Sequence, residues 1–236
     1  MLSDLLPGRR VEWFATLDST MTEAARLARK GCASGTVVVA DQQTAGIGRQ
    51  GHSWHSEEGA GLYVSIVLRV PPNPFLMLAI GLATQKAIGL HTGNAADLRW
   101  PNDVLLDGKK CAGVLANAEA GAIIAGIGIN VAHTRFPDEL QNLATSLRLH
   151  GSSATREQVL VDLVREVEAH AALDGEEIRA RFLESSSYAQ GLRVRVDLEG
   201  RTLEGVTQGL DPSGFLLVRE DNGKETTILA GGVRPV

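Results

Sequence analysis

Apolar residues along this chain follow two spacings. Short runs rich in β-branched residues predict strands, whereas apolar residues that return every three or four positions predict helices. The predicted strands cover residues 11–15, 36–40, 61–70 and 122–131, and the predicted helices cover about 20–30, 74–92 and 155–167, with a further helix that ends near 184. The pattern predicts one large domain in which helices cover a sheet.

The pattern changes after Gly191. Residues 192–198 alternate strictly between apolar and polar side chains, as in a strand with one buried face, and turn sequences follow at 211–214 and 222–223. A stretch of this length is too short for a large core of its own. We therefore expect a small β-barrel that is docked on the first domain.

Two of the predicted helices begin at capping sequences. Thr20 is followed three residues later by Glu23, and Thr155 by Gln158, which is the spacing of a capping box. A capping role is also the simplest interpretation of Ser19 and Thr20 when these residues are taken alone.

Composition and charge narrow the class of protein. The chain has 236 residues, 44% of them hydrophobic and 22% charged, as in ordinary globular proteins. Its net charge of -5 argues against general nucleic-acid binding, which needs a basic excess. With neither a signal sequence nor an apolar run of membrane-spanning length, we expect a cytoplasmic protein without a membrane partner. The two cysteines and six histidines lack metal-ligand spacing, so the sequence implies no protein-bound metal.

A glycine-rich loop follows the predicted strand at 36–40. Glycines curl the chain tightly, so the backbone N–H groups and Arg49 can hold phosphate or carboxylate. Gly46, Gly48 and Gly51 also match the dinucleotide fingerprint G-x-G-x-x-G, which requires a helix at the loop and an acidic residue about twenty positions later. A strand at 61–70 follows instead, so we reject that interpretation.

A second set of polar residues lies around a predicted hairpin. Asp107-Gly108 between two apolar runs is typical of a tight hairpin turn. The turn brings Lys110 on the returning strand near Asn102 and Asp103. Taken alone, Lys109 and Lys110 are better explained as solubilising charges on an edge strand. The buried run at 122–131 ends similarly in a polar side chain, Asn130, which could be a turn residue or a ligand contact.

Together these stretches resemble the biotin protein ligases, also called biotin–[acetyl-CoA-carboxylase] ligases. The loop resembles their G-R-G-R-x-G-R segment. Residues 100–103 with 109–115 resemble K-W-P-N-D and K-x-x-G-I-L, and residues 126–131 resemble G-I-G-I-N-V. Three motifs in the family's order, followed by a small β-barrel, make the resemblance specific.

The resemblance implies an α+β fold and a two-step reaction. The expected architecture is a mixed β-sheet with flanking helices, a class II synthetase-like catalytic domain at 1–187, and an SH3-like β-barrel at 188–236. Such enzymes activate biotin with ATP and Mg²⁺ to biotinyl-5′-adenylate, then transfer biotin to a lysine of a biotin carboxyl carrier domain. No tightly bound prosthetic group is implied, and a homodimer is compatible with the resemblance.

The resemblance also implies roles for individual residues. Lys110 and Arg49 would be the catalytic residues. Biotin would be bound by Ser19, Thr20, Met21, Gln43, Gly46, Ile47, Gly48, Arg49, Lys110, Gly113 and Leu115. The nucleotide would be bound by Arg49, His52, Trp54, Asn102, Asp103, Lys110 and Asn130.

This chain departs from the family pattern at three positions. Ile47 and His52 stand where the family has arginine, and Met21 replaces a frequent asparagine. With fewer cations, we expect the adenylate to leave faster than is usual in the family. The chain also begins almost at the catalytic domain, so we expect no DNA-binding domain and no repressor function.

Two other functions are left open by the sequence. One is a lipoate or octanoyl ligase or transferase on a related fold, because Cys111 beside Lys110 could carry an acyl group. The other is a biotin-binding module without catalysis, which the unusual Ile47 and His52 suggest.

Overall fold

A seven-stranded mixed sheet forms the centre of the larger part of the molecule. The structure is a computed structural model that describes residues 6–71, 73–93, 95–198 and 200–236. The sheet contains β1 (Val11–Leu17), β2 (Thr36–Gln43), β3 (Gly61–Leu68), β4 (Asp97–Arg99), β5 (Asp103–Leu106), β6 (Lys109–Glu119) and β7 (Ala122–Asn130). Their order is β1-β2-β3-β7-β6-β5-β4. β1 and β2 are parallel, and the other neighbours are antiparallel.

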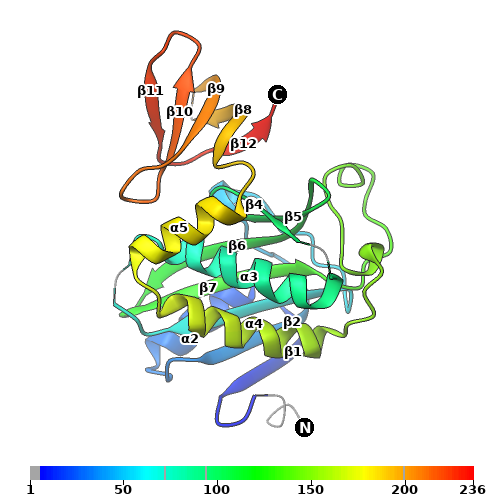
Figure 1. The fold of residues 1–236 in the computed structure, drawn as a ribbon. Helices are drawn as coiled ribbons and strands as arrows, with labels where there is room; N and C mark the ends of the chain where they lie inside the picture. Colours follow the sequence, from blue (N-terminus) through cyan, green and yellow to red (C-terminus); the bar gives the residue numbers. More distant parts are fainter. Residues whose placement is uncertain (1–5, 72, 94, 199) are drawn as a thin grey trace.

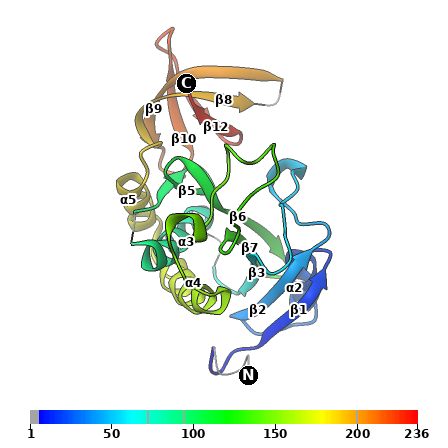
Figure 2. The same cartoon turned by 90° about the vertical axis from the view of Figure 1, so that its right-hand side faces the viewer.

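Helices cover both faces of this sheet. They are α2 (Thr20–Arg29), α3 (Leu76–Thr92), α4 (Arg156–Ala171) and α5 (Gly175–Ser185). Figure 1 shows α3 and α4 in front of the sheet, and the turned view in Figure 2 places α2 on the opposite side. The main core lies beneath α3 and α4, and a smaller core lies beneath α2. Because helices cover both faces, β3 is buried along its whole length.

The two predicted capping boxes have different outcomes. The box of Thr155 and Gln158 at the start of α4 is confirmed. The prediction of a capping box from Thr20 and Glu23 is wrong. Ser19 is the N-cap of α2, and its Oγ accepts a hydrogen bond from Met21 N at 3.3 Å. Thr20 therefore begins the helix, and its hydroxyl is free for other partners.

A five-stranded antiparallel sheet follows α5. It contains β8 (Gln190–Leu198), β9 (Arg201–Leu210), β10 (Leu216–Glu220), β11 (Glu225–Ile228) and β12 (Gly232–Pro235), in the order β11-β10-β9-β8-β12. In Figure 1 this sheet, in orange and red, stands at one end of the larger part. Trp100 Nε1 donates to Gly214 O at 3.0 Å, and the Arg179 guanidinium donates to Leu210 O. The predicted all-β C-terminal part is confirmed as an antiparallel sheet, whereas its closure into a β-barrel and the domain boundary at 187/188 stay predictions.

None of the helices in the described residues has both the length and the apolar composition of a membrane span.

Candidate active site

A cavity of about 280 Å³ lies between the glycine-rich loop, the ends of β5 to β7, and β12. It is lined by all but two of the residues predicted from the sequence: Ser19, Thr20, Met21, Gln43, Ile47, Gly48, Arg49, His52, Trp54, Asn102, Asp103, Lys110, Gly113 and Leu115. The fold thus brings four separate segments of the chain to one place. Which of these residues contact biotin and which contact the nucleotide stays a prediction.

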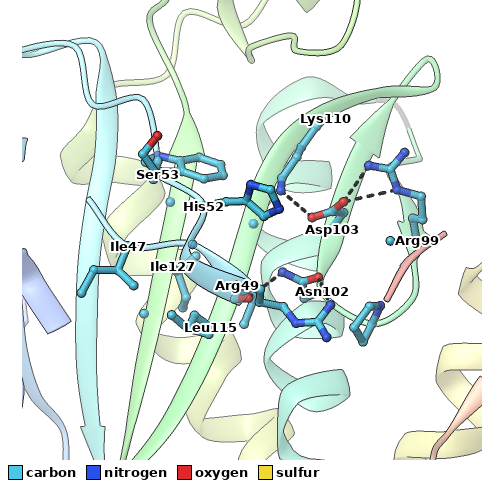
Figure 3. Close-up of a pocket in the computed structure, with 18 of the residues that line it drawn as sticks. Ile47, Arg49, His52, Ser53, Arg99, Asn102, Asp103, Lys110, Leu115 and Ile127 are labelled. Carbon is cyan, nitrogen blue, oxygen red and sulfur yellow. Dashed lines mark hydrogen bonds and ion pairs between the residues drawn. The ribbon is translucent and has the colours of Figure 1, made fainter. Parts of the chain in front are cut away.

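The glycine-rich loop connects β2 to β3 without a helix of dinucleotide-binding type. Ile47 and Ser53 form an isolated bridge, and Gly48 N donates to His52 O at 2.7 Å. A single 3₁₀ turn lies between them, and its Gly51 has a positive φ of 77°. Residues other than glycine rarely adopt this conformation, which lets the loop fold back on itself. The curl directs Arg49 into the cavity (Figure 3).

Arg49 is a partly buried cation that forms no ion pair with any described residue. Its guanidinium donates to Asn102 Oδ1 at 3.3 Å, and no described carboxylate lies within ion-pair distance of it. Burial lowers the pKa of the guanidinium, and the negative charge of Asp103 partly offsets this effect. Arginine nevertheless stays charged at neutral pH. Arg49 is therefore available to bind an anion.

The predicted hairpin positions the second cation. Asp107 and Gly108 both have positive φ, at 48° and 74°, and turn the chain from β5 into β6. Near the far end of β5, Asp103 lies between Lys110 and Arg99, each with a nitrogen 2.6 Å from a carboxylate oxygen (Figure 3). The lysine is thus held at the cavity wall by an ion pair, and the alternative role as a free edge-strand charge is excluded.

The same ion pairs set the charge of Asp103. Burial would raise the pKa of this carboxyl, but Lys110 and Arg99 outweigh the effect, and the pKa lies below its usual value. Asp103 therefore stays ionised at neutral pH. Asp103 is the single anion between Lys110 and Arg99, so these three side chains together carry one net positive charge. Arg49 adds a second positive charge.

Trp54 lies flat against two glycines of the sheet. A Cβ on Gly113 would lie 2.8 Å from its ring, and a Cβ on Gly128 would lie 2.5 Å from it. Lys110 Nζ lies 5.2 Å from the ring centroid, within range of a cation–π interaction. Nε1 of Trp54 is buried and has no partner among the described residues. Since a buried indole N–H normally has an acceptor, this donor fits a ligand in the cavity.

One end of the cavity combines amide and hydroxyl groups with apolar walls. Gln43 Oε1 accepts from Thr20 N at 2.9 Å and from Thr20 Oγ1 at 3.2 Å, and Thr20 Oγ1 accepts from Ser65 Oγ at 2.9 Å. Met21 packs closely over Gly126, and Leu115 and Ile127 supply apolar surface. This end can therefore bind an apolar molecule that carries a small polar group.

Gly46 and Asn130 do not line the cavity. Gly46 is buried at the base of the loop, where its carbonyl accepts from Trp54 N at 2.9 Å. Asn130 Nδ2 donates to Thr145 O at 2.9 Å and to Lys110 O at 3.4 Å. Both residues thus support the neighbours of the cavity in this structure, and their predicted ligand contacts stay predictions.

Several lining residues were not predicted from the sequence. Ser53 and Ile127 lie within stretches that resemble the family and Arg99 directly precedes one, and this position was the available signal. Gly232, Val233 and Arg234 come from β12 near the end of the chain, and Gly231 directly precedes this strand. These four residues belong to no recognised motif, and only the packing of the C-terminal sheet against the larger part brings them to the cavity.

Comparisons with known proteins agree over both parts of the chain. Residues 13–133 match the Biotin/lipoate A/B protein ligase family, and residues 191–233 match the Biotin protein ligase C terminal domain. The bifunctional ligase/repressor BirA of Bacillus subtilis is 34% identical over 239 residues, which cover 92% of this chain and 71% of that protein. The biotin–[acetyl-CoA-carboxylase] ligase of Mycobacterium tuberculosis is 33% identical and is matched over 88% of its length, with 95% of this chain covered.

A solved structure supports the same assignment. A biotin protein ligase from Aquifex aeolicus, in complex with biotin and ATP, superposes with a TM-score of 0.84 at 31% identity. The match covers 96% of this chain and 99% of that chain. With its motifs, its fold and both of its parts matched, the chain belongs to the biotin protein ligases of the biotin/lipoate A/B protein ligase family.

Proposed function

We propose that this protein activates biotin with ATP to biotinyl-5′-adenylate and pyrophosphate, and then transfers the biotinyl group to a lysine of a biotin carboxyl carrier domain. One observation carries the proposal: Arg49 and Lys110, from separate segments, line the same small cavity. Two cations at one cavity can hold two anions together, which activation of a carboxylate by a nucleotide requires.

Biotin fits the end of the cavity formed by Thr20, Gln43 and Met21. Its ureido group needs both donors and acceptors, which the amide of Gln43 and the hydroxyl of Thr20 supply. Its thioether ring and aliphatic chain need apolar surface, which Leu115 and Ile127 supply. In this orientation the biotin carboxylate extends toward the two cations.

In the first step, a biotin carboxylate oxygen attacks the α-phosphorus of ATP, and the bond to pyrophosphate breaks. Negative charge accumulates on the phosphoryl oxygens in the transition state. Lys110 stabilises this charge from a fixed position, because Asp103 and Trp54 hold its ammonium group. Arg49 binds the carboxylate and the phosphate, and its guanidinium can contact both at once.

Magnesium arrives with ATP as part of the substrate. Among the described residues that line the cavity, Asp103 is the single carboxylate, and both of its oxygens are paired with cations. Mg²⁺ usually takes few protein ligands and is held mainly by phosphates and water. The cavity therefore fits MgATP, with the phosphates supplying most of the ligands.

In the second step, the carrier lysine amine attacks the acyl carbon of the adenylate, an amide bond forms and AMP leaves. The relatives from Mycobacterium tuberculosis and Paracoccus denitrificans are named biotin–[acetyl-CoA-carboxylase] ligases, which supports a carboxylase carrier as the acceptor.

The net charge of -5 supports action without DNA. A mobility-shift assay with duplex DNA tests the latter point, and sedimentation velocity tests whether the protein is a homodimer.

Mass spectrometry of a carrier domain incubated with the protein, biotin and MgATP tests the main proposal. We expect the carrier to gain one biotinyl group and pyrophosphate to be released in a biotin-dependent manner. Lys110→Ala should abolish both events. Lys109→Ala is the matched control, because Lys109 Nζ donates to Gln141 O outside the cavity. Equal loss in both variants, or an unmodified carrier with the parent protein, would contradict the proposal.

The octanoyl-transferase alternative requires a reactive thiol, and the position of Cys111 in the structure does not suit this role. Its side chain is fully buried, faces Asn130 O at 3.7 Å and does not line the cavity. Burial also raises the pKa of the thiol, which keeps it protonated and unreactive. The same carrier assay with an octanoyl donor in place of biotin and ATP is expected to give no product.

A further inference from the structure

A second group of side chains with ligand chemistry lies outside the cavity lining. His55, Glu57 and His133 each place one ligand atom so that all three atoms lie within 4.8 Å of one another. His55 and Glu57 belong to the loop that precedes β3, and His133 follows the end of β7. A hydrogen bond from Ala132 N to Ala60 O, at 2.7 Å, holds these two segments side by side.

His133 is the unusual member of the group. Its side chain is 1% exposed, yet neither ring nitrogen has a hydrogen-bond partner among the described residues. A buried polar atom without a partner destabilises the folded state, so such atoms normally indicate a missing ligand. The ring stacks on Phe136 at a centroid distance of 5.0 Å, and its backbone carbonyl accepts from Ser146 Oγ at 2.6 Å. The imidazole is therefore held in place beside the two other side chains.

The donor atoms of the three side chains suit a cation. The two unpartnered ring nitrogens of His133 offer an imidazole lone pair, which is a common metal ligand. Glu57 supplies a carboxylate, 3.9 Å from His55 Nε2. The side chains of His55 and Glu57 are 38% and 53% exposed, so both can shift without repacking the core.

We propose that His55, Glu57 and His133 bind one divalent transition-metal ion of the zinc class. Two imidazoles and one carboxylate form a donor set that zinc favours, with a fourth position left for water. Bonds of roughly 2.0–2.2 Å require the ligand atoms to approach to about 3.5 Å. The exposed His55 and Glu57 make that movement, whereas His133 stays fixed.

Such an ion would brace the segment beside the cavity. Ser56 lies between the two exposed ligands, and its hydroxyl accepts from Gln43 Nε2 at 3.1 Å and donates to Trp54 O at 3.2 Å. Gln43 and Trp54 both line the cavity. The ion would thus tie the end of the glycine-rich loop to the end of β7. The inference concerns binding alone and does not depend on the proposed reaction.

Calorimetric titration of the full chain with Zn²⁺ in the absence of nucleotide tests the inference. We expect one equivalent to bind, with an affinity reduced at least tenfold in His55→Ala and in Glu57→Gln. Glu58→Gln is the matched control, because Glu58 is a neighbouring exposed carboxylate outside the group. Its affinity should equal that of the parent.

Titration with Co²⁺ adds a readout of the ligands. A visible absorption spectrum without a thiolate charge-transfer band is expected, since the two buried cysteines are not in the group. Both variants alter exposed side chains, so without metal their thermal unfolding should match the parent. Absence of one-equivalent binding, a thiolate band, or equal affinity in parent, His55→Ala and Glu57→Gln would each overturn the inference.

Discussion

At the scale of single residues, the cavity is distinguished by how its charges are paired. Asp103 is shared by Lys110 and Arg99, whereas Arg49 has only an amide partner in the described part of the chain. These four side chains together carry about two net positive charges, in a protein whose net charge is -5. Local pairing, and not overall composition, gives this protein its anion site.

Ile47 offers a direct test of this charge argument. Its side chain lines the cavity and is 46% exposed, at the position of an arginine in the family motif that the loop resembles. We expect Ile47→Arg to slow dissociation of the adenylate about two- to fivefold, because an exposed charge pair contributes up to about 1 kcal/mol. Ile47→Gln, which adds a polar side chain without charge, should change the rate little. Off-rates are measured by chasing labelled adenylate, and equal rates in all three proteins would contradict the charge argument.

Asp103 predicts a pH dependence of stability. Because its folded pKa is lowered, its stabilising contribution is complete above the unfolded value near 4 and is lost as pH falls through the folded value. Asp103→Asn should therefore cost about 1–3 kcal/mol of unfolding free energy at pH 7, and the difference from the parent should shrink below about pH 4. Urea unfolding at a series of pH values measures this.

The matched variant for that experiment is Asp107→Asn. Asp107 lies in the hairpin turn with its side chain 86% exposed, and asparagine tolerates its positive φ. Its effect should stay within about 0.5 kcal/mol at every pH. A difference between Asp103→Asn and the parent that does not vary with pH would show that the ion pairs are not its cause.

At the scale of elements, glycines have opposite effects in the sheet and in the helix. On β6 and β7, Gly113, Gly126 and Gly128 leave room for Trp54 and Met21, so the cavity exists because these strands lack side chains there. In α3, Gly81 makes no such contact, since a Cβ would lie 3.9 Å from Leu98 Cδ2, an ordinary packing distance.

This difference predicts opposite changes in stability. Gly81→Ala should raise the free energy of unfolding by about 0.5–1 kcal/mol, because glycine in a helix interior is less favourable than alanine. Gly126→Ala should lower it and weaken biotin binding, because the new Cβ would lie 2.6 Å from Met21 Sδ. Chemical unfolding and biotin titration measure both, and a destabilised Gly81→Ala variant would contradict the packing argument.

At the scale of the whole molecule, the C-terminal sheet completes the cavity. Gly231 and residues 232–234 of β12 line it, and Figure 1 shows the C-terminal sheet at one end of the larger part, with α5 preceding it along the chain. Trp100 lines the same cavity and donates to Gly214 O, so one residue belongs to both the site and the contact between the two parts.

Trp100→Phe should therefore affect both stability and binding. Loss of the Nε1 donor leaves the Gly214 carbonyl without that partner, at a cost of about 1–3 kcal/mol of unfolding free energy. The variant should also bind ATP more weakly, because β12 is less firmly held at the cavity. Urea unfolding and ATP titration measure the two effects. Unchanged values for both would show that this contact does not secure the C-terminal sheet.

The sequence by itself determined the local elements and most of the cavity lining. Apolar spacing predicted the main strands and helices, Asp107-Gly108 predicted the hairpin, and three motifs predicted that Arg49 and Lys110 share a site. These features can be predicted from the sequence because each depends on neighbours within a few residues or on a motif with fixed spacing.

Only the tertiary structure decided the features that depend on distant partners. Thr20 resembled a helix cap in the sequence, but its hydroxyl binds Gln43 and Ser65 instead. Arg234 enters the cavity lining through domain packing, and His133 lies beside His55 and Glu57 through the pairing of two loops. No local sequence pattern predicts these contacts. They form because strands that are distant in sequence pair in the sheet, which brings the segments at their ends together.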